Sequence, residues 1–195
     1  MVREILSAAA IGLTFVLFVP YVRAILGGRL KPHVFSWVIW GMVTFTVFLA
    51  QLAGGGGVGA WAIGVSGIIT FYIAALAWRH RGDTAITRGD CAFLVIAASA
   101  LPVWAITAEP VWAVVILTGA DLAGFGPTLR RAYAQPHLES PLFFALAGVR
   151  NGLVVLALEQ HSTTTVLFPA AVGLACLLLA ALLLWRRAAL AVPGR

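Results

Sequence analysis

The chain has 195 residues, of which 62% are hydrophobic and 10% are charged, with a net charge of +6. Soluble domains contain about 45–50% apolar and about 25% charged residues, so this composition excludes a water-soluble globule built around a single core. It also excludes a disordered chain, because disorder requires low hydrophobicity and high charge. The composition is typical of an integral membrane protein.

Seven apolar segments are long enough to cross a hydrocarbon core of about 30 Å, which takes roughly 17–25 residues of helix. They cover residues 5–22, 34–53, 58–78, 91–107, 111–129, 141–158 and 164–185. Lipid offers backbone polar groups no partner, so spanning segments must form helices or closed barrels, and these lengths favour helices. We expect an all-α membrane protein that forms a single integral membrane domain over residues 1–195.

The first segment follows Arg3 and resembles a signal peptide, but its apolar run of about 17 residues is longer than the usual apolar region of such a peptide. We therefore expect it to remain in the mature protein as a transmembrane helix. Pro20 lies near the end of this segment and Pro127 near the end of the fifth. Each proline removes a backbone donor, and so acts either as a hinge or as the point where the helix terminates.

Two ionisable residues lie inside the expected spans, Asp121 in the fifth and Arg150 in the sixth, where Asn151 follows it. Charged groups in a bilayer cost roughly 2.5–3.5 kcal/mol each on insertion scales, so they are candidates for function by default. At a rise of 1.5 Å per residue, both lie about 14–15 Å from the ends of their helices. If the fifth and sixth helices are antiparallel neighbours, the two charges meet near the middle of the membrane.

Two interpretations of this pair remain open. In the first, Arg150 clamps a carboxylate or another anion, while Asp121 pairs with it in the empty state or carries a coupling proton. In the second, the ion pair is structural and only holds the fifth helix in register with the sixth.

The basic residues predict the orientation of the chain. Eleven of the 13 lie on one side, in the loops after the first, third and fifth segments and at the C-terminus, whereas Arg3 lies on the other side and Arg150 within a span. Short cytoplasmic loops carry an excess of Lys and Arg. We expect the N-terminus outside and the C-terminus in the cytoplasm, in the cell inner membrane. The charge therefore indicates topology and contact with anionic lipid, not a nucleic-acid partner.

Three sequence matches recur in the same order along the chain. They are VPYVR at 19–23 with GPTLR at 126–130, PHVFS at 32–36 with PHLES at 136–140, and ALAWR at 75–79 with LLLWR at 182–186. They predict a duplication, with a first three-helix repeat over 1–78, a linker helix over 79–110 and a second three-helix repeat over 111–195. The linker helix gives both repeats the same orientation. Through the repeat, Asp121 corresponds to Thr14 and Arg150 to Thr46.

This 3+1+3 plan resembles the PQ-loop superfamily, which includes the SWEET sugar transporters. The resemblance rests on Pro20 and Pro127 at the cytoplasmic ends of the first and fifth helices, and on a basic loop that leads to a serine on the second and sixth. Tyr21 and Thr128 stand where the family has its characteristic glutamine. The resemblance implies a transporter whose repeats alternate access, with the two prolines as hinges of a cytoplasmic gate.

We therefore expect a small-solute transporter that works by alternating access. Its polar site lies at the middle of the membrane and suits an anionic or zwitterionic solute, because it contains an arginine. The site comprises Asp121, Arg150, Asn151, Thr46 and Thr14.

The alternative is a non-transporting scaffold or partner-subunit protein, whose aliphatic last helix contacts another helix. No nucleophile–base pattern, metal-ligand spacing or cofactor motif is visible, so no enzyme, metal or cofactor is expected. The expected partners are membrane lipid and a small-molecule solute, and a homo-oligomer is left open.

Overall fold

The structure, a computed structural model, describes residues 1–30, 32–80, 84 and 86–191. These residues form α-helices and two short 3-10 turns, and this part of the chain contains no strand, which confirms the expected all-α class. The elements are α1 (Val2–Leu26), α2 (Val34–Ala53), η1 (Gly57–Ala60), α3 (Trp61–Arg79), α4 (Arg88–Thr107), α5 (Pro110–Ala134), η2 (Pro136–Leu138), α6 (Pro141–Ala157) and α7 (Thr163–Ala191).

Six of the helical segments are long and apolar enough to cross a membrane: α1, α2, η1 together with α3, α4, α5 and α7. The sixth expected segment forms α6, which has 17 residues and is the short apolar helix of the fold. Its length corresponds to about 25 Å of helix. The seven expected apolar segments therefore all fall on helices, and α6 lies at the lower end of the length range that crosses a hydrocarbon core.

Local sequence sets where several of these helices begin. At the start of α4, the Thr87 hydroxyl accepts a hydrogen bond from the Asp90 amide at 3.2 Å, and the Asp90 carboxylate accepts one from the Thr87 amide at 2.8 Å. This reciprocal capping box satisfies two amides that the first turn leaves free. Ser140 caps α6 in a similar way, and Pro141 occupies the first helical position, where a missing N–H does no harm.

The prolines near the ends of α1 and α5 do not terminate these helices. Pro20 lies inside α1, which continues to Leu26, and α5 continues past position 127 to Ala134. The side chain of Pro127 lies outside the described part of the structure. The interpretation of Pro20 and Pro127 as helix terminators is therefore wrong, and their role as hinges stays a prediction.

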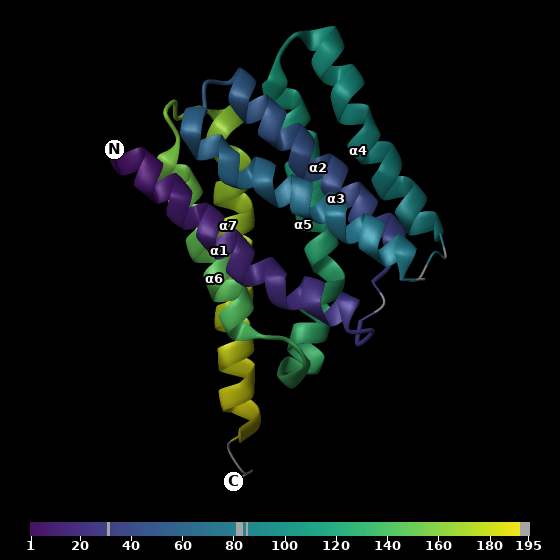
Figure 1. The fold of residues 1–195 in the computed structure, drawn as a ribbon. Coiled ribbons are helices and arrows are strands. Elements are labelled where there is room, and N and C mark those ends of the chain that lie inside the picture. Colours follow the sequence, from purple (N-terminus) through teal and green to yellow (C-terminus); the bar gives the residue numbers. More distant parts are fainter. Residues whose placement is uncertain (31, 81–83, 85, 192–195) are drawn as a thin grey trace.

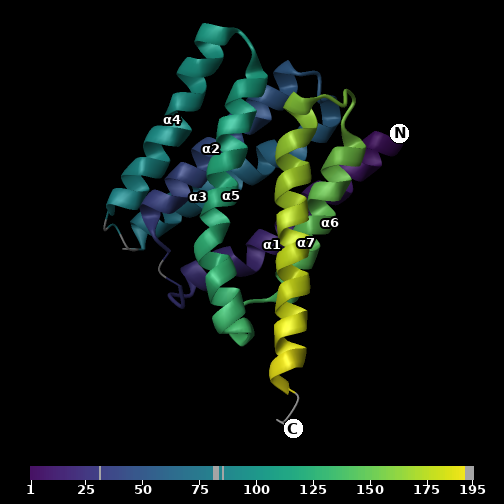
Figure 2. The same cartoon turned by 180° about the vertical axis from the view of Figure 1, so that it is seen from behind.

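The three helices before α4 and the three after it share one packing pattern, in which the third helix contacts the first two. α3 packs against both α1 and α2, and α7 packs against both α5 and α6. Figures 1 and 2 show α7 lying between α5 and α6 from both sides. Between the two groups, α1 packs against α6 and α2 packs against α5, while α4 covers α5 and α2.

The ends of the helices gather at two ends of the bundle. The N-terminus and the connections after α2, α4 and α6 lie at the upper end in Figure 1, whereas α1, α3, α5 and α7 end toward the other side. Large apolar side chains along the helices face outward, among them Val95, Ile106, Leu174 and Leu178. Such a surface is what a helix in contact with lipid presents.

Candidate functional site

Arg150 lies in the middle of α6 and is only 7% exposed. Its guanidinium donates hydrogen bonds to three partners on three elements. Nε donates to the Thr14 hydroxyl of α1 at 3.1 Å, Nη2 to the Ala62 carbonyl of α3 at 2.6 Å, and Nη1 to the Asn151 amide oxygen at 3.2 Å. We call these residues the Arg150 cluster, and it ties α6 to both α1 and α3.

The partners of Arg150 are themselves held in place. The Thr14 hydroxyl donates to the Ala10 carbonyl at 2.9 Å, and the Asn151 side-chain amide donates to the Ala147 carbonyl at 2.9 Å. Both bonds run one turn back along the same helix, so each acceptor oxygen is free to face the guanidinium. Thr14, Arg150 and Asn151 are all buried. Neutral dipoles therefore surround this charge, and no carboxylate of the described residues forms an ion pair with it.

Small residues let α6 and α7 approach each other closely beside this cluster. A Cβ on Gly148 would lie 2.5 Å from Leu177 Cγ and 3.2 Å from the Gly173 carbonyl oxygen, so a larger residue does not fit there. A Cβ on Gly152, in contrast, would meet no atom within 4 Å. Close approach therefore depends on Gly148 and its partner Gly173 and not on Gly152.

Asp121 lies in the middle of α5 and is half-buried. No hydrogen bond or ion pair joins its carboxylate to another residue in the described part of the chain; the ion pair found there joins the N-terminal amine to Glu4. A buried carboxylate without a partner is unfavourable, since the protein does not replace the water that the charge has lost.

The predicted ion pair between Asp121 and Arg150 is therefore not formed. The prediction assumed that the fifth and sixth helices are direct neighbours, but α7 lies between them (Figure 2). The Cys176 thiol of α7 is within electrostatic range of both charges. The two charged residues therefore lie in different surroundings.

Thr46 of α2 is buried, and no hydrogen bond joins it to the Arg150 cluster. The structure therefore brings together three of the five predicted site residues, Thr14, Arg150 and Asn151. Neither Asp121 nor Thr46 forms a hydrogen bond with these three.

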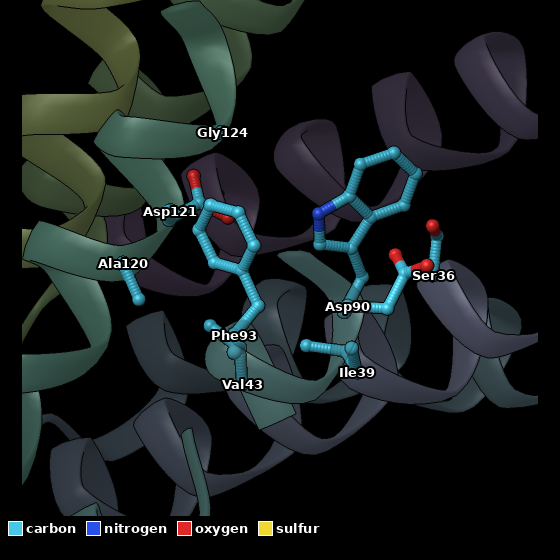
Figure 3. A pocket seen from close by; sticks show the side chains of 9 residues that line it. Ser36, Ile39, Val43, Asp90, Phe93, Ala120, Asp121 and Gly124 are labelled. Atoms are coloured by element: carbon cyan, nitrogen blue, oxygen red, sulfur yellow. The ribbon is translucent and has the colours of Figure 1, made fainter. Parts of the chain in front are cut away.

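Asp121 instead lines a cavity of about 170 Å³ between α2, α4 and α5. Figure 3 shows Asp121 and Phe93 at one side of this cavity and Asp90 and Ser36 at the other. We call this space the Asp121 cavity. Its lining residues are Ser36, Ile39, Trp40 and Val43 of α2, Asp90 and Phe93 of α4, and Ala120, Asp121 and Gly124 of α5.

The Asp121 cavity extends toward the end of the bundle that holds the C-terminus. Ser36 and Asp90 belong to the first turns of α2 and α4, whereas Asp121 lies near the middle of α5. At 1.5 Å per residue, Asp121 is about 16 Å from the start of its helix. The cavity therefore runs from the helix ends to the depth of Asp121.

At the opposite end of the bundle, hydrogen bonds join two connections. The amides of Glu159 and Gln160 donate to the carbonyls of Gly56 and Gly55, both at 3.1 Å, and the Glu159 carboxylate accepts from the Val58 amide at 3.1 Å. We call these contacts the loop clamp. The clamp joins the turn between α2 and η1 to the connection between α6 and α7.

Glycines are required at the loop clamp. Gly55 and Gly57 have φ angles of 77° and 57°, which other residues rarely adopt. Gly59 packs so closely on α6 that a Cβ there would lie 2.5 Å from the Leu158 nitrogen. Below the clamp, the buried side chain of Gln51 donates to the Thr165 carbonyl at 2.7 Å.

Sequence reasoning missed Trp40, Asp90 and Phe93 as cavity residues, and Glu159 as a clamp residue. The Thr87 and Asp90 spacing did carry a readable signal, because it matches a capping box and so fixes the start of α4. That signal gives the position of Asp90 along its helix but not the cavity that it faces.

No protein-family model, curated protein or solved structure matches this chain.

Proposed function

We propose that this multi-pass membrane protein is a small-solute transporter of the PQ-loop type, in which two three-helix repeats alternate access to a site at the depth of Asp121. The site is the Asp121 cavity, which lies between α2 of the first repeat and α5 of the second. In this proposal α6 crosses the membrane as the seventh span, and α4 links the repeats.

The packing order of the helices supports two equivalent repeats. The third helix of each repeat, α3 or α7, packs against the first two. The contacts between the repeats are reciprocal, since α1 packs on α6 and α2 packs on α5. A parallel repeat related by an axis along the membrane normal has this pattern.

The charges support an orientation with the N-terminus outside and the C-terminus in the cytoplasm of the inner membrane. The described basic residues at the end of the bundle that holds the C-terminus are Arg23, Arg29, Arg79, Arg88, Arg130, Arg186 and Arg187. Positive charge of this kind favours the cytoplasmic side. In this orientation the cavity faces the cytoplasm and the loop clamp closes the outer side.

The observation that carries the proposal is the carboxylate of Asp121, which lines a cavity inside apolar helices and has no partner among the described residues. An ionisable group in this position is costly unless a proton or a bound solute neutralises it. A scaffold would gain nothing from such a residue. The rival function, a non-transporting scaffold or partner subunit, would need a structural pair with Arg150, which Asp121 does not form.

Alternating access predicts that one position in the cavity reacts from both sides of the membrane. Gly124 lines the cavity, and an added Cβ there meets no atom within 4 Å, so Gly124→Cys fits. In a Cys91→Ser, Cys176→Ala background, a membrane-impermeant maleimide should label Gly124→Cys in both inside-out and right-side-out vesicles. Labelling from the cytoplasmic side should be faster, because the loop clamp closes the other side.

Gly119→Cys provides a matched control on the same helix. Gly119 also has open space for a Cβ and is exposed, but it does not line the cavity, so its thiol should face lipid and stay unlabelled. Labelling of Gly124→Cys from the cytoplasmic side alone, at any reaction time, would contradict transport and leave a one-sided pocket.

A further inference from the structure

The lining of the Asp121 cavity has a definite charge character. Two of its nine residues, Asp90 and Asp121, carry carboxyl groups, and none of the nine is basic. The Asp90 carboxylate uses its Oδ2 atom to accept from the Thr87 amide and hydroxyl, at 2.8 and 2.7 Å, while His33 lies within electrostatic range. Asp121 has no partner in the described part of the chain. A solute in this cavity therefore meets net negative charge.

Arg150 does not change this character. Three of its donors are taken by Thr14, Ala62 and Asn151, on the side of the bundle formed by α1, α3 and α6, and it does not line the cavity. The sequence-based preference for an anionic or zwitterionic solute depended on an arginine in the site. With Arg150 elsewhere, the geometry no longer favours an anion.

Aromatic rings complete the lining. Trp40 of α2 and Phe93 of α4 both border the cavity, together with the aliphatic side chains of Ile39 and Val43. The face of an aromatic ring attracts a cation, and tryptophan does so most strongly. Carboxylates combined with ring faces and apolar walls match an organic cation better than a hydrated metal ion, which needs several oxygen ligands.

The cavity volume limits the size of the solute. A cavity of 150 Å³ lined by apolar side chains is known to hold benzene, and this cavity measures about 170 Å³. It therefore has room for one small ring or a short branched chain carrying a single ammonium group. Larger solutes such as disaccharides do not fit in this state.

We propose that the Asp121 cavity binds a small organic amine in its cationic form, with the ammonium against the Asp121 carboxylate and the apolar body between Trp40 and Phe93. This inference rests on the proposed function only in taking the cavity as the solute site. Binding by itself does not require transport, so the two proposals can fail separately.

Three probes of nearly equal size and shape test the charge preference: benzylammonium, benzyl alcohol and benzoate. Isothermal titration of the full chain in nanodiscs should show benzylammonium binding at least about tenfold more tightly than benzyl alcohol, since a charge-assisted contact and a cation–π contact are lost with the alcohol. Benzoate should not bind. Equal affinity for benzylammonium and benzyl alcohol would overturn the proposal, because the cavity would then be merely apolar.

Variants locate the binding. Asp121→Asn keeps the size of the side chain and should weaken benzylammonium by at least about tenfold, while Phe93→Leu should weaken it by about three- to tenfold through loss of the ring face. Glu109→Gln removes an exposed carboxylate outside the cavity and should leave the affinity unchanged. Unchanged affinity in both Asp121→Asn and Phe93→Leu would overturn the proposal.

Flux measurements separate this inference from the proposed function. If benzylammonium binds in a way that depends on Asp121 but shows no flux in proteoliposomes, the amine-site proposal stands and the transport proposal is contradicted. If neutral or anionic solutes cross the membrane and benzylammonium does not inhibit their flux, the transport proposal stands and the amine-site proposal is contradicted.

Discussion

Arg150 and Asp121 are both charged residues near the middle of apolar helices, but their surroundings differ. The Arg150 guanidinium donates three hydrogen bonds to α1, α3 and its own helix, whereas the Asp121 carboxylate accepts none in the described part of the chain and borders a cavity. The protein thus surrounds the Arg150 charge with hydrogen-bond acceptors. The Asp121 carboxylate has no such partner among the described residues, so only a proton or a bound solute would neutralise it. The comparison teaches that two charged residues at similar positions along apolar helices can have different hydrogen-bonding surroundings, which the position alone does not reveal.

The first prediction tests the structural side of this comparison and has the largest expected effect. Arg150→Ala removes three hydrogen bonds and leaves a hole where three helices meet, so it should lower stability by about 2–5 kcal/mol, as large-to-small core substitutions do. Thermal unfolding in detergent, followed by circular dichroism, measures this. An unchanged unfolding temperature would mean that the Arg150 cluster does not hold the helices together.

The second prediction compares glycines on the two sides of the bundle. Gly59→Ala places a Cβ against the backbone of Ala157 and Leu158, and such overpacking typically costs about 1–3 kcal/mol. Gly124→Ala is the matched control, because its Cβ enters the open space of the Asp121 cavity. The same unfolding assay should show a lower melting temperature for Gly59→Ala only. Equal losses in both variants would contradict the difference between a packed side and an open one.

The third prediction concerns the functional side. Asp121→Asn removes an unpaired charge and breaks no hydrogen bond, so the unfolding temperature should stay the same or rise. Benzylammonium binding should fall at least about tenfold in the same preparation. A marked loss of stability in Asp121→Asn would show that the carboxylate has a structural partner after all.

The fourth prediction has the smallest effect and tests the loop clamp. Glu159→Gln weakens the hydrogen bond to the Val58 amide, which is solvent-exposed, so the outer side should open more often. External maleimide labelling of the Gly124→Cys variant should speed up by about two- to fivefold, the effect of one weakened hydrogen bond. Exposed Glu109→Gln, in the connection between α4 and α5, serves as the control. A slower external reaction would contradict the role of the clamp as an outer gate.

Much of the fold follows from the sequence alone. Apolar length gave the position of every helix, because the period and extent of apolar runs are local properties. The sixth segment is a close case, since residues 141–158 were expected and α6 covers Pro141–Ala157, at the lower end of spanning length. The helical course through Pro20 was not predictable either, since a proline near a helix end is compatible with both continuation and termination.

The site was less predictable, for a physical reason. Three of the five residues expected at one polar site, Thr14, Arg150 and Asn151, are joined by hydrogen bonds, as buried polar groups usually are. The pairing of Arg150 with Asp121 failed because sequence neighbours α5 and α6 are separated in space by α7. The order of helices around a bundle is set by long-range packing. The cavity lined by Trp40, Asp90 and Phe93 therefore cannot be predicted until that packing is known.

The most direct test of the account is the uptake of radiolabelled benzylammonium into proteoliposomes by wild type, Asp121→Asn and Arg150→Lys, each scaled to the amount of folded protein. Asp121→Asn should keep wild-type stability and lose uptake, because the carboxylate holds the cation. Arg150→Lys should lose stability, since a lysine cannot reproduce the fork of hydrogen bonds, while the folded fraction still transports. Uptake that persists in Asp121→Asn and disappears in folded Arg150→Lys would contradict the account and place the solute at the Arg150 cluster.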